Sequence, residues 1–407
     1  MSRPTPNRGP LGVWLIGARG AISTCVAYGL SGLVDGLLEP VGLCTEAPPL
    51  RRLSLAPLEE IVLGGHDVCS RSLTDSAAEL LDCGVLTPGL IESATARASA
   101  FEARVRPGLL DGPDVGLADL DPRSAELGSL PPREQVARVQ ADLDEFERAH
   151  GLARAVVVNV ASTEAWRDES GDWARLADFE AALDAGRAQP ASTLYAYAAL
   201  ASGRPYVNFT PSRGSSIGAL RELAERGGVP HCGSDGKTGE TLLKTVLAPM
   251  FRARALKVLA WQGYNMLGNR DGEVLSEAAH RASKLRNKDQ ALRSILAEPD
   301  LHTAVGIDFV PSLKDWKTAW DFVHFEGFLG ARMSLQLTWC GSDSALAAPL
   351  VIDLARLADL AAELGEGGVM EHTACYFKAP LGGGAHDFAQ QFERLVAYAA
   401  ARAGAAG

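Results

Sequence analysis

The sequence predicts an α/β protein in which a doubly wound parallel sheet carries a second, inserted α+β domain with an open, largely antiparallel sheet. Two observations predict this fold class. Over the first 240 residues, short apolar segments alternate with helical segments, which is typical of parallel strands joined by helices. After residue 240, strand-like segments follow one another with fewer helical segments between them, until a last helical stretch allows the chain to return to the first sheet.

In the first part, strands and helices are predicted from apolar runs and helical periodicity. Residues 104–131 are rich in Gly, Pro and Asp, so we expect a long irregular segment on the surface there. The expected strands are 12–17 (GVWLIG), 40–44 (PVGLC), 155–161 (AVVVNVA) and 205–209 (PYVNF), and the expected helices are 21–33, 132–149, 190–202 and 215–226.

In the later part, the pattern changes to consecutive strands and then to helices. The expected strands are 256–263, 303–310, 321–328 and 332–339, followed by a helix at 345–364, a strand at 369–377 and a helix at 387–404. These changes divide the chain into residues 1–240, 241–343 and 344–407. We expect the third part to complete the sheet that the first part begins.

Composition limits the class of function. A net charge of −11 argues against nonspecific binding to nucleic acid or to an anionic membrane surface. No signal-peptide core and no apolar run of about 18 residues is present, so we expect a cytoplasmic protein. The seven cysteines form no C-x-x-C pair and the histidines no H-x-x-x-H cluster. Reduced thiols are therefore expected, and no zinc motif is found.

The turn after the first expected strand is a candidate dinucleotide site in a Rossmann-like domain. Gly17, Ala18, Arg19, Gly20, Ala21 and Ile22 form this turn. It departs from G-x-G-x-x-G because Arg19 stands where the second glycine belongs, but its position would point backbone N–H groups and a helix N-terminus at a pyrophosphate. A plain strand-to-helix turn is the alternative. The acidic partner of the ribose is either Glu46 or Asp67, and both choices stay open.

A second glycine-rich loop, GSDGKTGET at 233–241, runs directly into an amphipathic helix. Unpaired N–H groups at such a helix start, with hydroxyl groups beside them, favour a phosphate ligand. A nucleotide-binding P-loop would require glycine at position 231, where His231 stands. A capped helix without a ligand is the alternative.

All eight lysines lie after residue 236, whereas arginine supplies the positive charge of the first part. A lysine ammonium is compact and can lose its proton when desolvated, so lysine suits acid–base chemistry better than arginine. Lys284 and Lys288 share one face if their segment is helical, Lys317 lies between two tryptophans, and Lys378 ends an apolar strand-like segment. We treat these four as candidate active-site residues, with solvated side chains as the alternative.

Several long motifs occur here in the order found in myo-inositol-1-phosphate synthases, and the chain resembles that family, its archaeal-type branch most of all. The resemblance covers nearly the whole length. The motifs are NVASTE at 159–164, VNFTPS at 207–212, GSDGKTGETLLKTVLAPMF at 233–251, YNMLGNRDG at 264–272, KDWKTAWDFVHFEGFLG at 314–330, AAPL at 347–350 and YFKAP at 376–380.

The resemblance implies a Rossmann-like NAD domain made of residues 1–240 and 344–407, with a catalytic domain at 241–343 that also forms a homotetramer. It implies bound NAD, recycled in each turnover, while glucose 6-phosphate is oxidised at carbon 5, enolised, closed by an aldol step between carbons 6 and 1, and reduced again. The product would be myo-inositol 1-phosphate, also called inositol 3-phosphate. The positions that would line NAD are Gly17, Ala18, Arg19, Gly20, Ala21, Ile22, Asp67, Ala161, Ser162 and Asp235.

The resemblance also implies roles at the substrate. Lys284 and Lys378 would act near the carbon 5 oxygen, and Lys317 would stabilise the oxyanion at carbon 1. Asn265, Asp271 and Asp343 match further active-site positions. Thr238 and Asp271 are where a divalent or monovalent cation would be held. The substrate phosphate would be held by Thr238, Gly239, Glu240, Thr241 and Lys288.

One departure from the family pattern is Cys340, which stands where an acidic residue is expected three positions before Asp343. The main alternative function is a paralog that forms a five-membered cyclitol phosphate from a hexose or ketose phosphate. A net NAD-dependent oxidoreductase and a catalytically silent binding protein are further alternatives.

Overall fold

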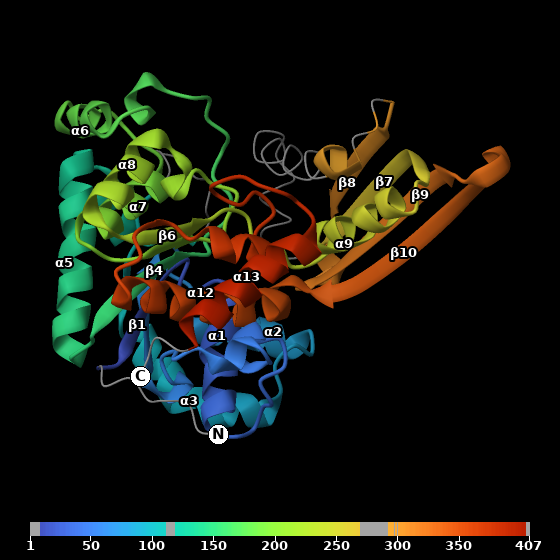
Figure 1. Cartoon of the computed structure of the whole chain (residues 1–407). Helices are drawn as coiled ribbons and strands as arrows, with labels where there is room; N and C mark the ends of the chain where they lie inside the picture. The colour runs from blue at the N-terminus through green and yellow to red at the C-terminus, as the bar shows by residue number, and fades with distance from the viewer. Residues whose placement is uncertain (1–8, 111–118, 269–291, 297, 299, 404–407) are drawn as a thin grey trace.

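The computed structural model describes residues 9–110, 119–268, 292–296, 298 and 300–403. Two sheets organise these residues, one of seven strands and one of four. The four-stranded sheet projects from one side of the body that surrounds the larger sheet (Figure 1). Among the described residues, no helix is long and apolar enough to cross a membrane.

The seven-stranded sheet is parallel throughout and has the strand order β11-β6-β5-β4-β1-β2-β3. β1 lies inside the sheet and all six of its residues are buried, which explains the uninterrupted apolar run LGVWLI. The strands are β1 Leu11–Ile16, β2 Ile61–Asp67, β3 Val105–Pro107, β4 Arg154–Asn159, β5 Tyr206–Asn208, β6 Pro230–Gly233 and β11 Gly368–Val369.

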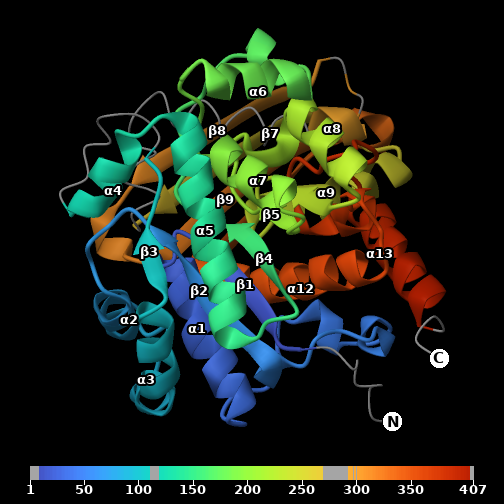
Figure 2. The same cartoon turned by 90° about the vertical axis from the view of Figure 1, so that its left-hand side faces the viewer.

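Helices cover both faces of this sheet, as a doubly wound fold requires. One face packs against α1, α3 and α12, and the other packs against α5, α7 and α8 (Figure 2). The helices are α1 Ala21–Val34, α2 Leu73–Asp82, α3 Pro88–Glu102, α4 Pro122–Gly128, α5 Pro132–His150, α6 Leu176–Asp184, α7 Ala191–Ala201, α8 Gly218–Gly227, α9 Glu240–Ala253, α12 Asp343–Glu363 and α13 Phe388–Arg402.

The second sheet has the strand order β10-β9-β7-β8. β9 pairs antiparallel with β10 and with β7, and β8 pairs parallel with β7, so the sheet is largely antiparallel as predicted. α9 covers one face, where Phe251 packs against Trp261 and Phe325. The strands are β7 Lys257–Leu267, β8 His302–Phe309, β9 Trp316–Glu326 and β10 Arg332–Ser342.

α12 returns the chain to the first sheet, because it begins directly after β10 and packs against α1. Its buried polar residues hold the segment before β2: Asp353 accepts hydrogen bonds from the backbone N–H of Cys44 and the hydroxyl of Thr45. Arg356 pairs with Glu46 at 2.8 Å. β11 then adds a short parallel strand beside β6.

Two predicted strands are wrong. Residues 41 and 42 form a turn in which Gly42 adopts φ +89, and Cys44 begins a 3-10 helix. The strand that follows β1 along the chain is β2 instead. Most of 369–377 is a 3-10 helix, Glu371–Tyr376, in which the Thr373 hydroxyl donates to the carbonyl of Met370. Such local side-chain bonds compete with strand pairing.

Other elements were not predicted. The segment 104–131 contains β3 and α4, although a wholly irregular stretch was expected. β6, α2, α3 and α6 were also missed, and β11 overlaps the expected strand 369–377 only at Val369. The short strands pair over only two to four residues each, so their apolar signal is weak.

Candidate active site

The β1–α1 turn brings backbone very close to the end of β4. Gly17 has φ +88, and a Cβ on it would lie 2.9 Å from the Cα of Ala161, so only glycine fits. Gly20 is the N-cap of α1 and gives it no side-chain cap. The first N–H groups of a helix have no intrahelical acceptor, so this start suits a pyrophosphate.

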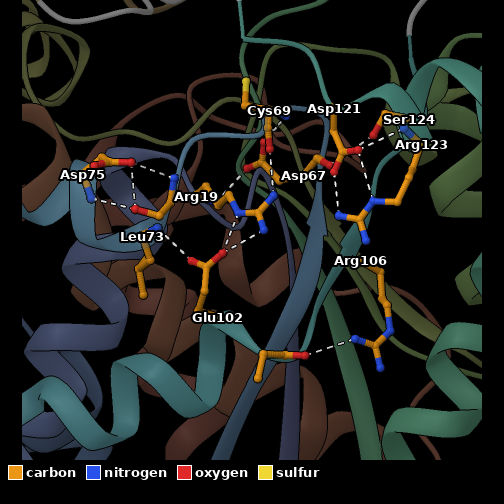
Figure 3. Close-up of polar contacts among 12 residues, drawn as sticks. Arg19, Asp67, Cys69, Leu73, Asp75, Glu102, Arg106, Asp121, Arg123 and Ser124 are labelled. Carbon is orange, nitrogen blue, oxygen red and sulfur yellow. Dashed lines mark hydrogen bonds and ion pairs between the residues drawn. The ribbon is translucent and has the colours of Figure 1, made fainter.

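Asp67 ends β2 beside this turn and is held by two backbone N–H groups. Its Oδ2 accepts from Arg19 at 2.7 Å, and its Oδ1 accepts from Cys69 at 2.8 Å (Figure 3). Burial raises the pKa of Asp67, while these two hydrogen bonds lower it. Glu46, the other acidic candidate, pairs with Arg356 instead. The geometry therefore favours Asp67 as the carboxylate beside the turn.

The side chain of Arg19 turns away from the helix start. Its Nε donates to Glu102 at 2.8 Å, and its Nη1 donates to the carbonyl of Cys69 at 2.7 Å (Figure 3). Glu102 also accepts from the backbone N–H of Leu73 at the start of α2. Arg19 thus ties the turn to α3 and to the segment after β2, and its guanidinium is committed to protein acceptors.

The remaining predicted cofactor positions follow other strands at the same edge. Ala161 and Ser162 come directly after β4, and Asp235 comes two residues after β6. β1 lies between β2 and β4, so the connections leave it in opposite directions. In doubly wound folds the ligand crevice lies at such a switch point, which here is between the carboxyl ends of β1 and β4. The structure brings the β1–α1 turn, Asp67, Ala161 and Ser162 together around this crevice.

The predicted phosphate loop leads into α9, whose N-cap is Gly239 without a side-chain cap. The hydroxyl of Thr241 is buried in the first turn and has no hydrogen-bond partner among the described residues. An unpaired buried hydroxyl costs about 1–3 kcal/mol, which a ligand oxygen would recover. Loop and hydroxyl together fit a phosphate.

Asp343, the first residue of α12, joins two predicted site residues. Its Oδ1 accepts from the Thr238 hydroxyl at 3.2 Å, and its Oδ2 accepts from Lys317 Nζ at 3.2 Å. Lys317 stands on β9, on the face of the sheet that α9 covers, because the same face carries Ala319 and Val323, both buried. The start of α9, β9 and α12 therefore meet at one carboxylate.

Lys378 pairs with Asp235, at 2.7 Å between Nζ and Oδ1. The backbone N–H of Lys378 also donates to the carbonyl of Asp235, so the two residues are fixed side by side. Asp235 has φ 63, in the left-handed region. This pair places an ammonium between the carboxyl edge of the large sheet and the phosphate loop.

Three predicted residues, Asp271, Lys284 and Lys288, lie outside the described residues. Within the described part of the chain, no group of three His, Cys, Asp or Glu side chains is suited to a metal. Thr238, the other predicted cation ligand, donates to Asp343.

Two buried lysines were given no role by the sequence. Lys237 Nζ donates to Gln391 on α13 at 2.6 Å, and burial lowers the pKa of Lys237 to about 8. Lys244 is fully buried and pairs with Glu240, one turn earlier on α9. The Glu240–Lys244 pair is predictable from the sequence, because Glu and Lys four positions apart on an amphipathic helix share one face.

The chain is similar to known proteins over most of its length. The NAD-binding family model described as myo-inositol-1-phosphate synthase matches residues 11–399. Inositol-3-phosphate synthase 1 of Bacteroides thetaiotaomicron is 32% identical over 413 residues, which cover 95% of this chain and 92% of that protein. Inositol-3-phosphate synthase of Spirodela polyrhiza is 31% identical over 327 residues, 76% of this chain but only 62% of that longer protein.

The fold is also found in solved structures. The crystal structure of inositol-3-phosphate synthase from Caenorhabditis elegans superposes with a TM-score of 0.86 at 22% identity, covering 98% of this chain and 86% of that chain. At this level of identity the likeness shows a shared fold.

Proposed function

Because this chain belongs to the myo-inositol-1-phosphate synthase family, we propose that it cyclises glucose 6-phosphate to myo-inositol 1-phosphate, also called inositol 3-phosphate. The reaction is oxidation at carbon 5, enolisation, aldol closure between carbons 6 and 1, and reduction of carbon 5. Its net result is an isomerisation, so the enzyme is an intramolecular lyase. NAD, which residues 17–22 and Asp67 would hold, would supply the hydride chemistry for the oxidation and the reduction at carbon 5.

The β1–α1 turn supports the cofactor assignment. Gly17 through Ile22 would hold the pyrophosphate, since α1 begins after Gly20 without a side-chain cap on its first N–H groups. Asp67, Ala161 and Ser162 would line the rest of the crevice. Arg19 acts by holding the turn, because its guanidinium is bonded to Glu102 and Cys69.

The observation that carries the proposal is the shared carboxylate of Asp343. It links Thr238, at the start of the phosphate-binding helix, to the ammonium of Lys317. A sugar phosphate whose phosphate lies at residues 238–241 would extend its carbon chain toward this ammonium. Lys317 would then stabilise the oxyanion that forms at carbon 1 during ring closure.

Lys378 would act at the carbon 5 oxygen. Asp235 holds it at the carboxyl edge of the sheet, where NAD would lie. An ammonium there would polarise the carbon 5 ketone and favour loss of a proton from carbon 6. Lys284 is proposed to assist at the same oxygen, Lys288 at the phosphate, and Asp271 at a cation; these roles rest on the family motif alone.

We also propose a homotetramer in the cytoplasm, with residues 241–343 as its assembly and catalytic domain and residues 1–240 and 344–407 as the NAD domain. The four-stranded sheet supports this, because the face away from α9 exposes Tyr264 and Trp320, and Phe322 and His324 stack beside Trp320. All seven cysteines are free thiols. Light scattering coupled to gel filtration would show four chains per particle; a monomer would refute the assembly.

Product analysis tests the function. The protein is incubated with NAD and either glucose 6-phosphate or fructose 6-phosphate, and the products are identified by phosphorus and carbon NMR while NADH absorbance is followed. We expect a six-membered cyclitol phosphate from glucose 6-phosphate with no accumulation of NADH. A five-membered product would indicate the paralog activity, a steady rise in NADH a net oxidoreductase, and no cyclic product would refute the proposal.

A further inference from the structure

Beneath the start of α9 lies a buried charged cluster that the reaction scheme does not use. Lys244 Nζ donates to Glu240 Oε1 and lies 3.7 Å from Asp321 Oδ1 on β9. Trp261 Nε1 donates to the same Asp321 oxygen at 2.8 Å. Glu240, Lys244 and Asp321 are each at most 2% exposed. The carboxylate of Glu240 therefore lies inside the protein, and only its backbone N–H is placed to meet a phosphate.

β7 passes directly over the ion pair. A Cβ on Gly263 would lie 2.2 Å from Glu240 Oε1 and 2.9 Å from Lys244 Nζ, so any side chain at this position would displace the ion pair. Two residues later on the same face, Asn265 Nδ2 donates to Glu240 Oε2 at 2.6 Å. The two carboxylate oxygens of Glu240 thus accept hydrogen bonds from different residues, Oε1 from Lys244 and Oε2 from Asn265.

This hydrogen bond fixes the orientation of the Asn265 amide. With Nδ2 bonded to Glu240, Oδ1 must point elsewhere, and it is a buried acceptor with no partner among the described residues. Asn265 pairs with Ala319 and Leu267 with Lys317 across β7 and β9, so Asn265 and Lys317 share one face of the sheet. Asn265 Oδ1 is therefore an unpaired hydrogen-bond acceptor near Lys317. A hydroxyl group of a sugar phosphate could donate the missing hydrogen bond.

We propose that the buried Glu240–Lys244 ion pair is a positioning device that holds the Asn265 amide with Oδ1 as the acceptor for a hydroxyl of the substrate's carbon chain. This inference rests on the proposed function for the identity of the substrate. Lys244 holds the carboxylate of Glu240 in place between α9, β7 and β9. Glu240 and Lys244 act through Asn265 and do not touch the reacting atoms.

Two charge-balanced double variants test the device. E240Q/K244M and E240L/K244M each remove one buried positive and one buried negative charge, but only glutamine keeps a carbonyl that can accept from Asn265 Nδ2. The probe is D-glucitol 6-phosphate, which has the hydroxyls of the substrate but no aldehyde and cannot cyclise. Its Kd is measured by calorimetry with NAD present, alongside the Kd values of inorganic phosphate and of NAD and the melting temperature.

We expect E240L/K244M to bind glucitol 6-phosphate at least tenfold more weakly than E240Q/K244M, with equal affinities for inorganic phosphate and for NAD. Equal affinities for glucitol 6-phosphate in two folded variants would overturn the proposal. A parallel loss for inorganic phosphate would overturn it too, because the pair would then support the phosphate loop.

A second measurement needs no variant and covers the case in which one fails to fold. Monodeoxy analogues of glucitol 6-phosphate are bound to the unmodified protein. One of them should bind at least tenfold more weakly than the parent, since it lacks the hydroxyl that Asn265 Oδ1 accepts; equal binding of all would refute the device. Failure to form any cyclic product would count against the proposed function alone, because these probes report binding.

Discussion

The nucleotide edge, formed by the β1–α1 turn and Asp67, and the lysine edge, formed by Thr238, Lys317, Asp343 and Lys378, use positive charge differently. At the nucleotide edge the cation is Arg19, whose planar fork bonds two fixed protein acceptors, Glu102 and Cys69. At the lysine edge each described ammonium bonds one carboxylate, Lys317 with Asp343 and Lys378 with Asp235.

This difference supports the proposed roles, in which Arg19 holds the β1–α1 turn and the two lysines act on the substrate. A guanidinium stays charged and is held in one geometry by its several bonds. An ammonium with a single carboxylate partner keeps donors for a substrate oxygen. We therefore expect replacement of Lys317 by arginine to lower kcat far more than replacement of Arg19 by lysine.

Lys317→Arg should give the largest loss. The charge is kept, but a planar guanidinium cannot place a compact donor at the carbon 1 oxyanion, and losing such a donor costs about 10²–10³-fold in kcat. The Kd for NAD, measured by tryptophan fluorescence, should change less than twofold because the ammonium of Lys317 is bonded to Asp343 rather than to the β1–α1 turn. Full activity in Lys317→Arg would contradict the proposed role of Lys317 at the carbon 1 oxyanion.

Lys237 should behave as a structural lysine, unlike Lys317 and Lys378. Burial lowers its pKa to about 8 in the fold, below the ordinary 10.5, so protonation disfavours the folded state below pH 8. Its contribution to stability should therefore rise between pH 8 and 10.5, by on the order of 3 kcal/mol. Urea unfolding of the wild type and Lys237→Met across this range should show the difference; parallel curves would contradict the pKa shift.

Arg19→Lys should give the smallest effect. A lysine can bond Glu102 or the carbonyl of Cys69 but lacks the fork that reaches both, and loss of one such bond costs about 1 kcal/mol, or roughly fivefold in affinity. We expect the Kd for NAD to rise three- to tenfold, with kcat at saturating NAD lowered less than threefold. A loss of kcat as severe as that in Lys317→Arg would show that Arg19 takes part in the chemistry.

The sequence predicted those features that depend on neighbouring residues. The β1–α1 turn and the start of α9 follow from glycines and hydroxyls within a few positions, and the interior of the large sheet follows from uninterrupted apolar runs. The segment at 40–44 was mistaken for a strand because its apolar residues outweighed Pro40 and Gly42 in the pattern, although Gly42 adopts a positive φ.

Contacts between distant segments could not be predicted from local pattern. Asp235 and Lys378 are 143 positions apart, and Thr238 and Asp343 are 105 apart. These pairs form only because α12 and the segment after β11 return to the first sheet. The buried Glu240–Lys244 pair was local, but its meaning depends on β7 passing over it at Gly263, which no spacing along α9 reveals.

We propose that a hydride leaves carbon 5 and returns to it within one active site. Glucose 6-phosphate deuterated at carbon 5 is converted with unlabelled NAD, and the product is examined by deuterium NMR and mass spectrometry. We expect the cyclitol phosphate to keep its deuterium while free NADH stays unlabelled. Loss of deuterium from the product, or its appearance in released NADH, would show that the hydride does not return to carbon 5.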